Sequence, residues 1–494
     1  MLCIAQPGRK RKELSSRACA WMLILCFAGC AVNPVTGRQE LMLVSESQEI
    51  EMGTSFYPNA LWGDLGGGGE YHDPQLKAYL RNIVLRLHSV SHRPNLPVDF
   101  AIQNSSVPNA WAIPGHVAIT RGLLAGLDNE AEFAFVMGHE MGHVAARHSA
   151  RHMTYGMVQQ AGLGAAGIAL SGKDYGNLAV GLGAVGSSLL LLKYGRDDEL
   201  EADRIGVEYM TALGYDPKYA ISAHRNLERI SQDYLKSLGK SPSERSFVED
   251  LFSTHPRTSV RIDELQQIIA SSQRRTIAGD GANQAAFRRA TAGIRETHRI
   301  YEDYYDRAVA LFQNEKTAEA ESLVGRAITA APDQPAFHSL LGYIRIRKKA
   351  FDEADRSFIT ALGIRNDYEP AFRGRGIVRY GRGQYDEALS FLQRSLELYP
   401  QDIPAHYFAG MANYRMRKCD EALPHLRLFA EAQQQHPEVH GILGICYESR
   451  NDLPNAYREY QLQQKVAPDS ELGRHAAERA AALKTVVERP PASR

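Results

Sequence analysis

The C-terminal part of the chain carries a pattern with an unvarying period. A small residue recurs every 34 positions, and an alanine follows each one 12 positions later. The small residues are Ala308, Gly342, Gly376, Gly410 and Gly444, and the alanines are Ala320, Ala354, Ala388, Ala422 and Ala456. A fixed period of this length is typical of proteins that stack one structural unit many times. The pattern predicts a repeat array, which we place at residues 301–486.

The repeated unit resembles the tetratricopeptide repeat, a helix–turn–helix of this length. The small residues would let the two helices of a unit pack closely. Proline cannot continue a helix, so Pro332, Pro400 and Pro468 would close units. The resemblance implies an α-solenoid whose concave face holds a segment of a partner protein, and a purely architectural array is the alternative. Residues 471–486 would form a capping helix, and 487–494 a disordered tail.

The N-terminus has the layout of a secretory signal. Residues 9–17 are mostly basic, and residues 18–29 form an apolar run too short to span a bilayer. The following Cys30 completes a Phe-Ala-Gly-Cys sequence that resembles a bacterial lipoprotein processing site. The resemblance implies a signal peptide at 1–29, a lipid on Cys30 and a periplasmic protein anchored in a membrane. The residue after Cys30 is Ala31 rather than aspartate or asparagine, which by analogy favours the outer membrane over the inner membrane. An ordinary signal peptide or an uncleaved anchor is the alternative.

Charge and cysteine content exclude some classes of protein. Lys and Arg number 57, as do Asp and Glu, so the chain has no net charge to attract nucleic acid. After removal of the leader and lipidation of Cys30, only Cys419 and Cys446 remain as thiols. Two thiols are too few for a disulfide framework or a cysteine metal site. One disulfide and two buried free thiols both stay possible.

A candidate metal-binding helix spans residues 130–152. Asn129 is a plausible N-cap, with Glu132 placed to complete a capping box. Inside the helix lies His139-Glu140-Met141-Gly142-His143, and residues four apart share a helix face, so both imidazoles can reach one zinc ion. Glu140 would not bind the metal but would take a proton from a water molecule and pass it to the leaving amine.

A second predicted helix, at residues 197–214, offers a third ligand. Asp198 with Glu201 gives a plausible cap for it. Glu199 and Asp203 are four apart and share a face. We therefore expect Glu199 to bind the metal and Asp203 to accept a hydrogen bond from a ligating imidazole. Glu201 would replace Glu199 as the ligand if the helix were rotated.

Together, H-E-x-x-H and E-x-x-x-D resemble the zinc peptidases that include the CAAX prenyl protease and the heat-shock protease HtpX. Residues 33–37 (NPVTG) and 109–115 (NAWAIPG) extend the resemblance, and His116 stands where relatives often carry glycine. The resemblance to these zinc peptidases implies a mainly α, gluzincin-type metalloprotease domain with a small β element, at residues 30–300. With the leader and the repeats, the chain resembles most the branch of this family that enhances β-barrel assembly. The implied partners are outer-membrane β-barrel proteins or their assembly machinery.

Two further segments have roles implied by the same resemblance. Residues 110–121 alternate like a strand pair turned at Pro114-Gly115, whose edge would bind a substrate peptide by strand addition; a structural hairpin is the alternative. The family also carries a His-Pro then Arg-Ile pattern, matched here by His255 and Arg261. These residues would stabilise the oxyanion, or His255 would bind zinc in a resting state. A capping histidine and a surface arginine are the alternative.

The sequence thus predicts a zinc metalloendopeptidase of the bacterial cell envelope that degrades misassembled outer-membrane proteins and assists assembly. A chaperone or assembly adaptor with a normally silent peptidase site is the second reading. A membrane-embedded prenyl-type protease is a third. The apolar segment 157–192 argues against it, because its longer uninterrupted arm, Leu178–Leu192, is too short to span a bilayer. We interpret this segment as a helical hairpin near the site that would cover the cleft or touch lipid, and a plain buried hairpin is the alternative.

Overall fold

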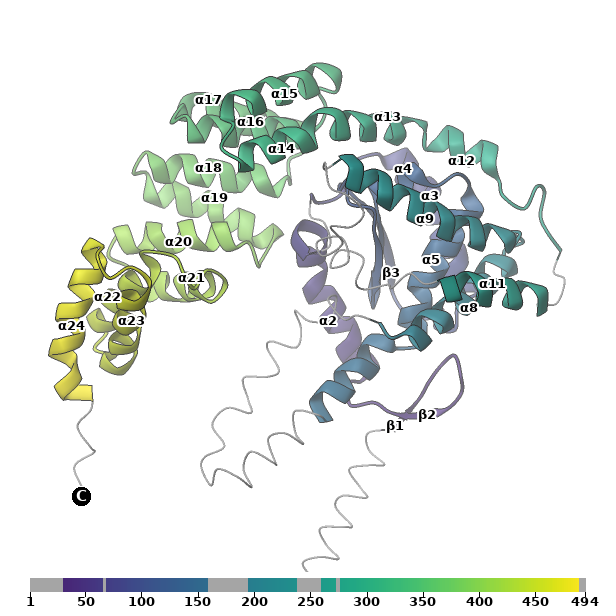
Figure 1. Cartoon of the computed structure of the whole chain (residues 1–494), viewed down its shortest axis with the longest axis horizontal. Helices are drawn as coiled ribbons and strands as arrows, with labels where there is room; N and C mark the ends of the chain where they lie inside the picture. The colour runs from purple at the N-terminus through teal and green to yellow at the C-terminus, as the bar shows by residue number, and fades with distance from the viewer. Residues whose placement is uncertain (1–29, 65–67, 159–193, 238–258, 272–275, 488–494) are drawn as a thin grey trace, which may run out of the picture. The chain divides into compact units, whose positions relative to one another are not determined.

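The computed structural model describes residues 30–64, 68–158, 194–237, 259–271 and 276–487 (Figure 1). The chain divides into two compact units after His298, two residues before the predicted domain limit. The predicted fold class, a mainly α protein with a small β element and a helical repeat array, is confirmed. The leader, His255, most of the 157–192 segment and nearly all of the C-terminal tail lie outside the described residues. Within the described ranges, no helix combines the length and the apolar content that crossing a bilayer requires.

A three-stranded sheet forms the β element of the first unit. Its order is β3-β5-β4, with β3 (Val98–Gln103) parallel to β5 (Gly115–Thr120) and β4 (Ala110–Ile113) antiparallel to β5. The predicted strand pair is therefore present, and Gly115 makes its turn with a φ of +96°, which favours glycine. The sequence analysis missed β3. Both faces of the sheet are buried, since Ala101 packs in one apolar cluster while its neighbours Phe100 and Ile102 pack in another.

Helices enclose the sheet, and α5 (Glu130–Ala145) lies at the centre of the unit, with nearly all of its residues buried. It packs against α3 (Pro74–Ser89), α8 (Arg196–Ala212), α9 (Lys218–Ser237) and both strands of the hairpin. The remaining elements of this part of the chain are β1 (Cys30–Val32), β2 (Gln39–Leu41), α2 (Glu46–Asn59), η1 (Ala60–Asp64), α4 (Arg121–Gly126), α11 (Ser259–Ser271), α12 (Gln284–Ala290) and α13 (Ala292–Ile300).

Two predicted helix boundaries are wrong. The first helix ends at Ala145 rather than continuing to 152, because Arg147 has a φ of +58° and its guanidinium donates to Glu49 and to the carbonyl of Val44. The chain turns there and is helical again from 148 to 158. The second helix begins at Arg196, so Asp198 lies inside it and bonds back to the N–H of Gly195, the actual N-cap residue. The first difference comes from distant contacts that local sequence does not encode, whereas the second comes from a local cap three residues earlier than the predicted one.

The second unit keeps the predicted period. The second helix of each repeat begins 34 residues after that of the preceding repeat, at Thr317, Phe351, Tyr385, Cys419 and Leu453. The recurring glycines are needed for close packing: a Cβ on Gly376 would lie 2.6 Å from Leu392, and one on Gly410 would lie 2.6 Å from Leu426. The elements are η3 (Tyr301–Tyr305), α14 (Asp306–Gln313), α15 (Thr317–Ala330), α16 (Pro335–Arg347), α17 (Phe351–Ile364), α18 (Glu369–Gly381), α19 (Tyr385–Leu398), α20 (Ile403–Arg415), α21 (Cys419–Ala432), α22 (Val439–Ser449), α23 (Leu453–Val466) and α24 (Glu471–Val487).

A disulfide joins Cys419, the first residue of α21, to Cys446 on α22, with the two Cα atoms 5.0 Å apart. The two cysteines are 27 residues apart in the sequence. Closing a loop of that length removes conformational entropy from the unfolded chain, so reduction should lower the free energy of unfolding of the repeats by about 3–4 kcal/mol. The measurement is urea unfolding followed by circular dichroism, with and without reductant. The Cys419→Ala/Cys446→Ala variant is the control and should no longer respond to reductant. An unchanged wild-type midpoint would contradict the prediction.

Candidate metal centre

Small residues bring α5 and α8 close enough to share a site. A Cβ on Gly142 would lie 3.2 Å from Ile205, and a Cβ on Gly206 would lie 3.1 Å from the backbone nitrogen of His139. Any larger side chain at these positions would push the two helices apart. Gly138 makes the same kind of approach, since its Cβ would lie 3.2 Å from the Cα of Gly206. The glycines therefore set the distance between the histidines of one helix and the carboxylates of the other.

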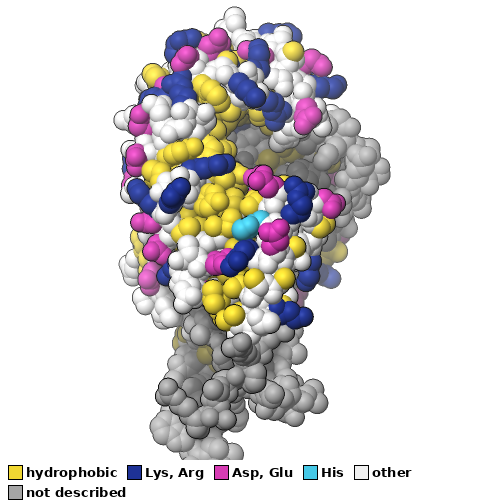
Figure 2. Space-filling model, turned by 90° about the vertical axis from the view of Figure 1, so that its left-hand side faces the viewer, with side chains coloured by type: hydrophobic (Ala, Val, Ile, Leu, Met, Phe, Trp, Pro, Cys, Tyr) yellow, Lys and Arg dark blue, Asp and Glu magenta, His cyan; other side chains and the backbone are white. Residues whose placement is uncertain are grey.

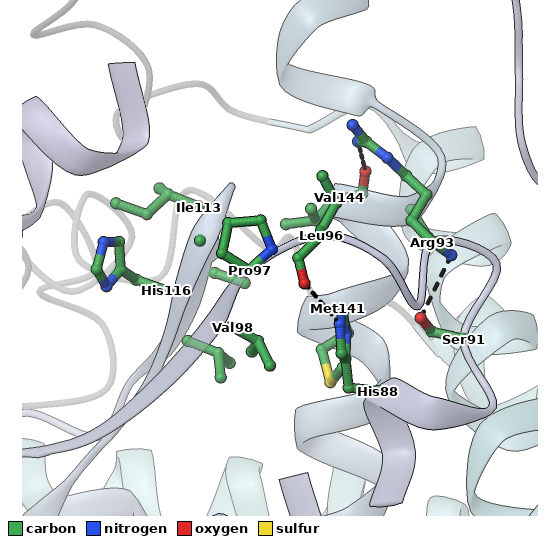
Figure 3. A pocket seen from close by; sticks show the side chains of 14 residues that line it. His88, Ser91, Arg93, Leu96, Pro97, Val98, Ile113, His116, Met141 and Val144 are labelled. Atoms are coloured by element: carbon green, nitrogen blue, oxygen red, sulfur yellow. Dashed lines mark hydrogen bonds between the residues drawn. The ribbon is translucent and has the colours of Figure 1, made fainter. Parts of the chain in front are cut away.

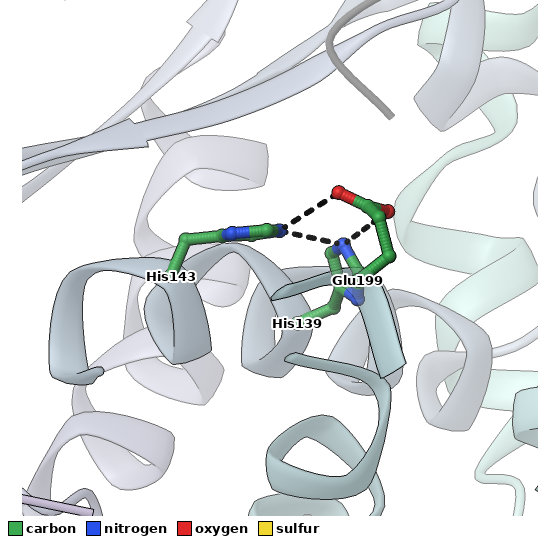
Figure 4. Close-up of side chains that lie close together, drawn as sticks. All are labelled: His139, His143 and Glu199. Atoms are coloured by element: carbon green, nitrogen blue, oxygen red, sulfur yellow. Dashed lines mark hydrogen bonds and ion pairs between the residues drawn. The ribbon is translucent and has the colours of Figure 1, made fainter. Parts of the chain in front are cut away.

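Three side chains from these helices converge, as Figure 4 shows. Nε2 of His143 lies 3.1 Å from Nε2 of His139 and 3.4 Å from Oε1 of Glu199. Nε2 of His139 lies 3.6 Å from Oε2 of Glu199. All three side chains are buried, and each offers one ligand atom within 4.8 Å of the others. This group could hold a metal ion.

The Nδ1 atom of His139 is held by Asp203, 2.8 Å from Oδ1. Burial lowers the pKa of His139. Burial alone would raise the pKa of Asp203, but the charge of Arg261 and the hydrogen bonds from Arg261 and His139 bring it well below its usual range. An ionised Asp203 accepts the Nδ1 proton of a neutral His139. The lone pair of His139 is then on Nε2, which faces the other two ligand atoms.

His143 is held by a partner that the sequence analysis did not assign to the site. Its Nδ1 lies 2.8 Å from Nδ1 of His148, and Nε2 of His148 lies 3.2 Å from Oε2 of Glu201. If Nε2 of His143 holds a metal, its Nδ1 donates to His148, whose Nε2 donates to Glu201. The turn at Arg147 makes this contact possible, because it carries the buried His148 back beneath α5. Glu201 thus lies behind the site, while Glu199 faces the two imidazoles.

Tyr194 supports the ring of His143 from another side. The two rings are stacked with centroids 3.9 Å apart, and the hydroxyl of Tyr194 lies 2.9 Å from that of Ser149. His152 lies 2.7 Å from Oδ2 of Asp198, whose other oxygen lies 3.8 Å from Nε2 of His148. Both later histidines thus lie beside Asp198, and among the contacts described only His148 also contacts a candidate metal ligand.

Replacing His148 with leucine should weaken metal binding by roughly 10–100-fold, the usual effect of losing the partner of a ligating histidine. Asparagine should restore most of the affinity, because its side-chain oxygen can accept from His143 at the place of Nδ1. The measurement is competition for Zn²⁺ against a chromophoric chelator. His440→Leu is the matched control: it removes another buried histidine paired with a glutamate, 2.7 Å from Glu459 in the repeats. Equal affinity of wild type and His148→Leu would contradict the prediction.

Arg261, on α11, contacts two carboxylates of α8, those of Glu199 and Asp203. Its Nε lies 2.7 Å from Oδ2 of Asp203, and its Nη1 lies 2.6 Å from Oε2 of Glu199. Burial alone would lower the pKa of Arg261, but the neighbouring carboxylates raise it, including Glu140, whose charge also acts on it. The arginine is buried rather than on the surface. Its contact with a substrate oxyanion stays a prediction, as does any role of His255.

The predicted substrate-binding strand lies beside α5. Within the described residues, β4 is the outer strand of the sheet and packs on α5. His116, at the end of the hairpin, stacks on Tyr57 with ring centroids 3.9 Å apart. Strand addition at β4 stays a prediction.

A separate cavity of about 30 Å³ lies between the start of the β5 strand and α5 (Figure 3). Met141 and Val144 line it from α5, together with Pro97 and His116. Met141 follows His139 by two residues, so it projects from nearly the opposite face of the helix. A cavity of this size has room for little more than a water molecule. It is therefore not part of the metal centre.

Comparison with known proteins agrees with this division of the chain. Residues 74–269 match the model of peptidase family M48, and residues 305–358 and 379–446 match models of the tetratricopeptide repeat. The matched peptidase segment contains every residue of the candidate centre.

Named relatives point the same way. The β-barrel assembly-enhancing protease of Escherichia coli is 30% identical over 37% of this chain and 38% of its own length. Its counterpart from Yersinia pestis is 25% identical over 75% of this chain and 78% of its own length. The mitochondrial metalloendopeptidase OMA1 of Arabidopsis thaliana is 30% identical over 36% of this chain and 33% of its own length. The chain therefore carries a peptidase domain of family M48 followed by tetratricopeptide repeats.

Proposed function

We propose that this protein is a zinc-dependent metalloendopeptidase of the bacterial cell envelope. The observation that carries the proposal is the convergence of His139, His143 and Glu199, with Glu140 beside them. The donor set fits zinc, which binds histidine nitrogen and glutamate oxygen. At a zinc–ligand distance of roughly 2.1 Å, tetrahedral ligand atoms lie about 3.4 Å apart. The two Nε2 atoms here are 3.1 Å apart, and each lies near a different oxygen of Glu199, His143 at 3.4 Å from Oε1 and His139 at 3.6 Å from Oε2.

Each residue of the centre has a task in peptide hydrolysis. Zinc, when bound, supplies a Lewis acid that polarises the scissile carbonyl and makes water more acidic. Glu140 accepts the proton of the attacking water and delivers it to the leaving nitrogen. Asp203 and the pair His148–Glu201 orient the two imidazoles. Arg261 fixes the carboxylates of Asp203 and Glu199, and we assign oxyanion stabilisation to Arg261 with His255.

We further propose that the enzyme works in the periplasm, attached to the outer membrane through a lipid on Cys30, with the repeats binding its clients. The names of the enterobacterial relatives support outer-membrane β-barrel proteins or their assembly machinery as these clients. The partly exposed Tyr380 of α18 contacts the partly exposed Phe408 of α20 in the next repeat, and the partly exposed Tyr407 of α20 packs on the buried Phe429 of α21. Figure 2, a view onto the repeats, shows hydrophobic side chains gathered in one area with charged side chains around it. Such areas are typical of protein-binding surfaces.

The test combines metal analysis with proteolysis. The mature chain, purified without added metal, should contain one zinc ion per molecule and cleave casein. Incubation with 1,10-phenanthroline should abolish cleavage, and added Zn²⁺ should restore it. Absence of stoichiometric metal would overturn the proposal.

An assembly adaptor with a normally silent peptidase is the alternative. It is favoured by one observation, the contact of Arg261 with the ligand carboxylate of Glu199, which a bound metal has to share. Zinc-loaded protein that binds clients but leaves casein and those clients intact would support this alternative.

A further inference from the structure

The two-stranded ribbon at the start of the described chain is apolar on its outer face. Val32 pairs with Gln39, and Cys30 pairs with Leu41. Because directly paired and alternate residues share a face, Val32 and Leu41 lie on the same side of the ribbon. Their exposed fractions are 57% and 37%, and Leu43, two residues further, is 45% exposed. Large apolar side chains on a small exposed ribbon need a reason beyond folding.

The opposite side of this segment is what holds it to the domain. Met42 and Val44 are buried in an apolar cluster with Ala150 and Met153 of the helix 148–158, and Ala31 packs against the same cluster. The backbone N–H of Leu43 donates to the hydroxyl of Thr154, 3.0 Å away. The ribbon is therefore fixed in place, and the outward apolar residues are not left exposed by a loose end.

The exposed apolar surface continues onto that helix. Tyr155 follows Thr154, whose hydroxyl binds the ribbon, and it is 58% exposed. Tyrosine is enriched where protein meets the headgroup region of a bilayer, because its ring is apolar and its hydroxyl is polar. We define Val32, Leu41, Leu43 and Tyr155 as the ribbon patch.

We propose that the ribbon patch lies against the lipid bilayer that carries the anchor of Cys30; this rests on the proposed lipid anchor. Cys30 belongs to β1 and pairs directly with Leu41, so the attachment residue is part of the ribbon. Acyl chains attached there enter the bilayer at the ribbon, which brings the patch to the membrane surface. Apolar side chains that enter the interface add to membrane binding in proportion to the apolar area that they bury. The domain thus rests on the membrane at a fixed face rather than hanging from a tether.

Vesicle binding without the anchor tests the patch separately. The mature Cys30→Ser protein, residues 30–494, has neither the leader nor an acyl chain, and it is mixed with vesicles of phosphatidylethanolamine and phosphatidylglycerol in a flotation assay. The triple variant Val32→Ser/Leu41→Ser/Leu43→Ser in this background should lose at least about tenfold in partition, because each serine removes apolar surface from the contact. Val90→Ser is the matched control, since Val90 is 38% exposed outside the patch, and it should partition like its parent. All three proteins should keep the same unfolding midpoint.

The outcomes separate the patch from the anchor. Equal partition of the triple variant and its parent overturns the bilayer contact. Self-association of the parent in the absence of vesicles, detected by sedimentation and lost in the triple variant, also overturns it, because a second copy then covers the patch. Mass spectrometry of the wild-type N-terminus reports independently on acylation. An unmodified Cys30 defeats the proposed anchor, and the flotation result then stands on its own for the patch.

Discussion

Replacing Glu140 with glutamine should lower the rate of peptide hydrolysis by roughly two to four orders of magnitude, the range that general acid–base groups contribute. Glutamine has nearly the same volume and stays beside His139, but its amide cannot accept the proton of the attacking water. The buried position of Glu140 makes replacement by bulk solvent ineffective. Casein cleavage under single-turnover conditions is the measurement, with zinc content determined in the same preparation.

The zinc content distinguishes a chemical effect from a structural one. Glu140 does not belong to the ligand group, so Glu140→Gln should bind one zinc ion as tightly as wild type. Loss of both metal and activity would mean that the substitution damages the site, and undiminished cleavage would remove Glu140 from the mechanism. The variant also separates the two candidate functions in cells. A protease loses its role in envelope assembly with Glu140→Gln, whereas an adaptor keeps it.

Replacing Glu199 with glutamine should weaken zinc binding by more than roughly 10–100-fold, which is the loss expected when a ligating histidine loses its hydrogen-bond partner, as in His148→Leu. The substitution removes the negative charge that two neutral imidazoles need beside them to hold a dication. It also removes the ion pair between Glu199 and Arg261, which leaves the arginine paired with Asp203. Zn²⁺ competition against a chelator gives the affinity directly.

Glu201→Gln is the matched control for this experiment. It changes the same residue type on the same helix, two positions away, and touches the centre only through His148. Its effect on zinc affinity should be smaller than that of His148→Leu, and that in turn smaller than that of Glu199→Gln. A larger loss with Glu201→Gln than with Glu199→Gln would show that the helix is rotated and that the ligand is misassigned.

The arrangement of the candidate centre follows from the sequence where helical periodicity governs it. His139 and His143 share a face because they are four residues apart, and the same spacing places Glu199 with Asp203 on α8. The repeats are equally regular, because each unit contacts only its neighbours and the small residues recur in phase. In these regions, local rules and tertiary contacts favour the same structure.

The sequence analysis went wrong where a distant side chain decides the backbone. Nothing local predicts that Arg147 leaves the helix, since its positive φ is stabilised by Glu49, almost one hundred residues earlier. The part played by His148 depends on that turn and was missed with it. The early end of α5 therefore hid the partner of a predicted ligand. A histidine shortly after the motif was a signal, but helical spacing alone would place it on another face.

The turn at Arg147 links the candidate metal centre to the segment that contains Glu49. Glu49 is buried between Arg147 and Arg93. Arg93 also donates a hydrogen bond to the carbonyl of Val144 on α5. The segment from Val44 to Glu49 thus supports the end of α5. A polypeptide shortened beyond Glu49 would keep every candidate ligand but lose the contact that fixes the turn at Arg147, and with it the position of His148 beside His143. N-terminal processing therefore has to leave Glu49 in the chain.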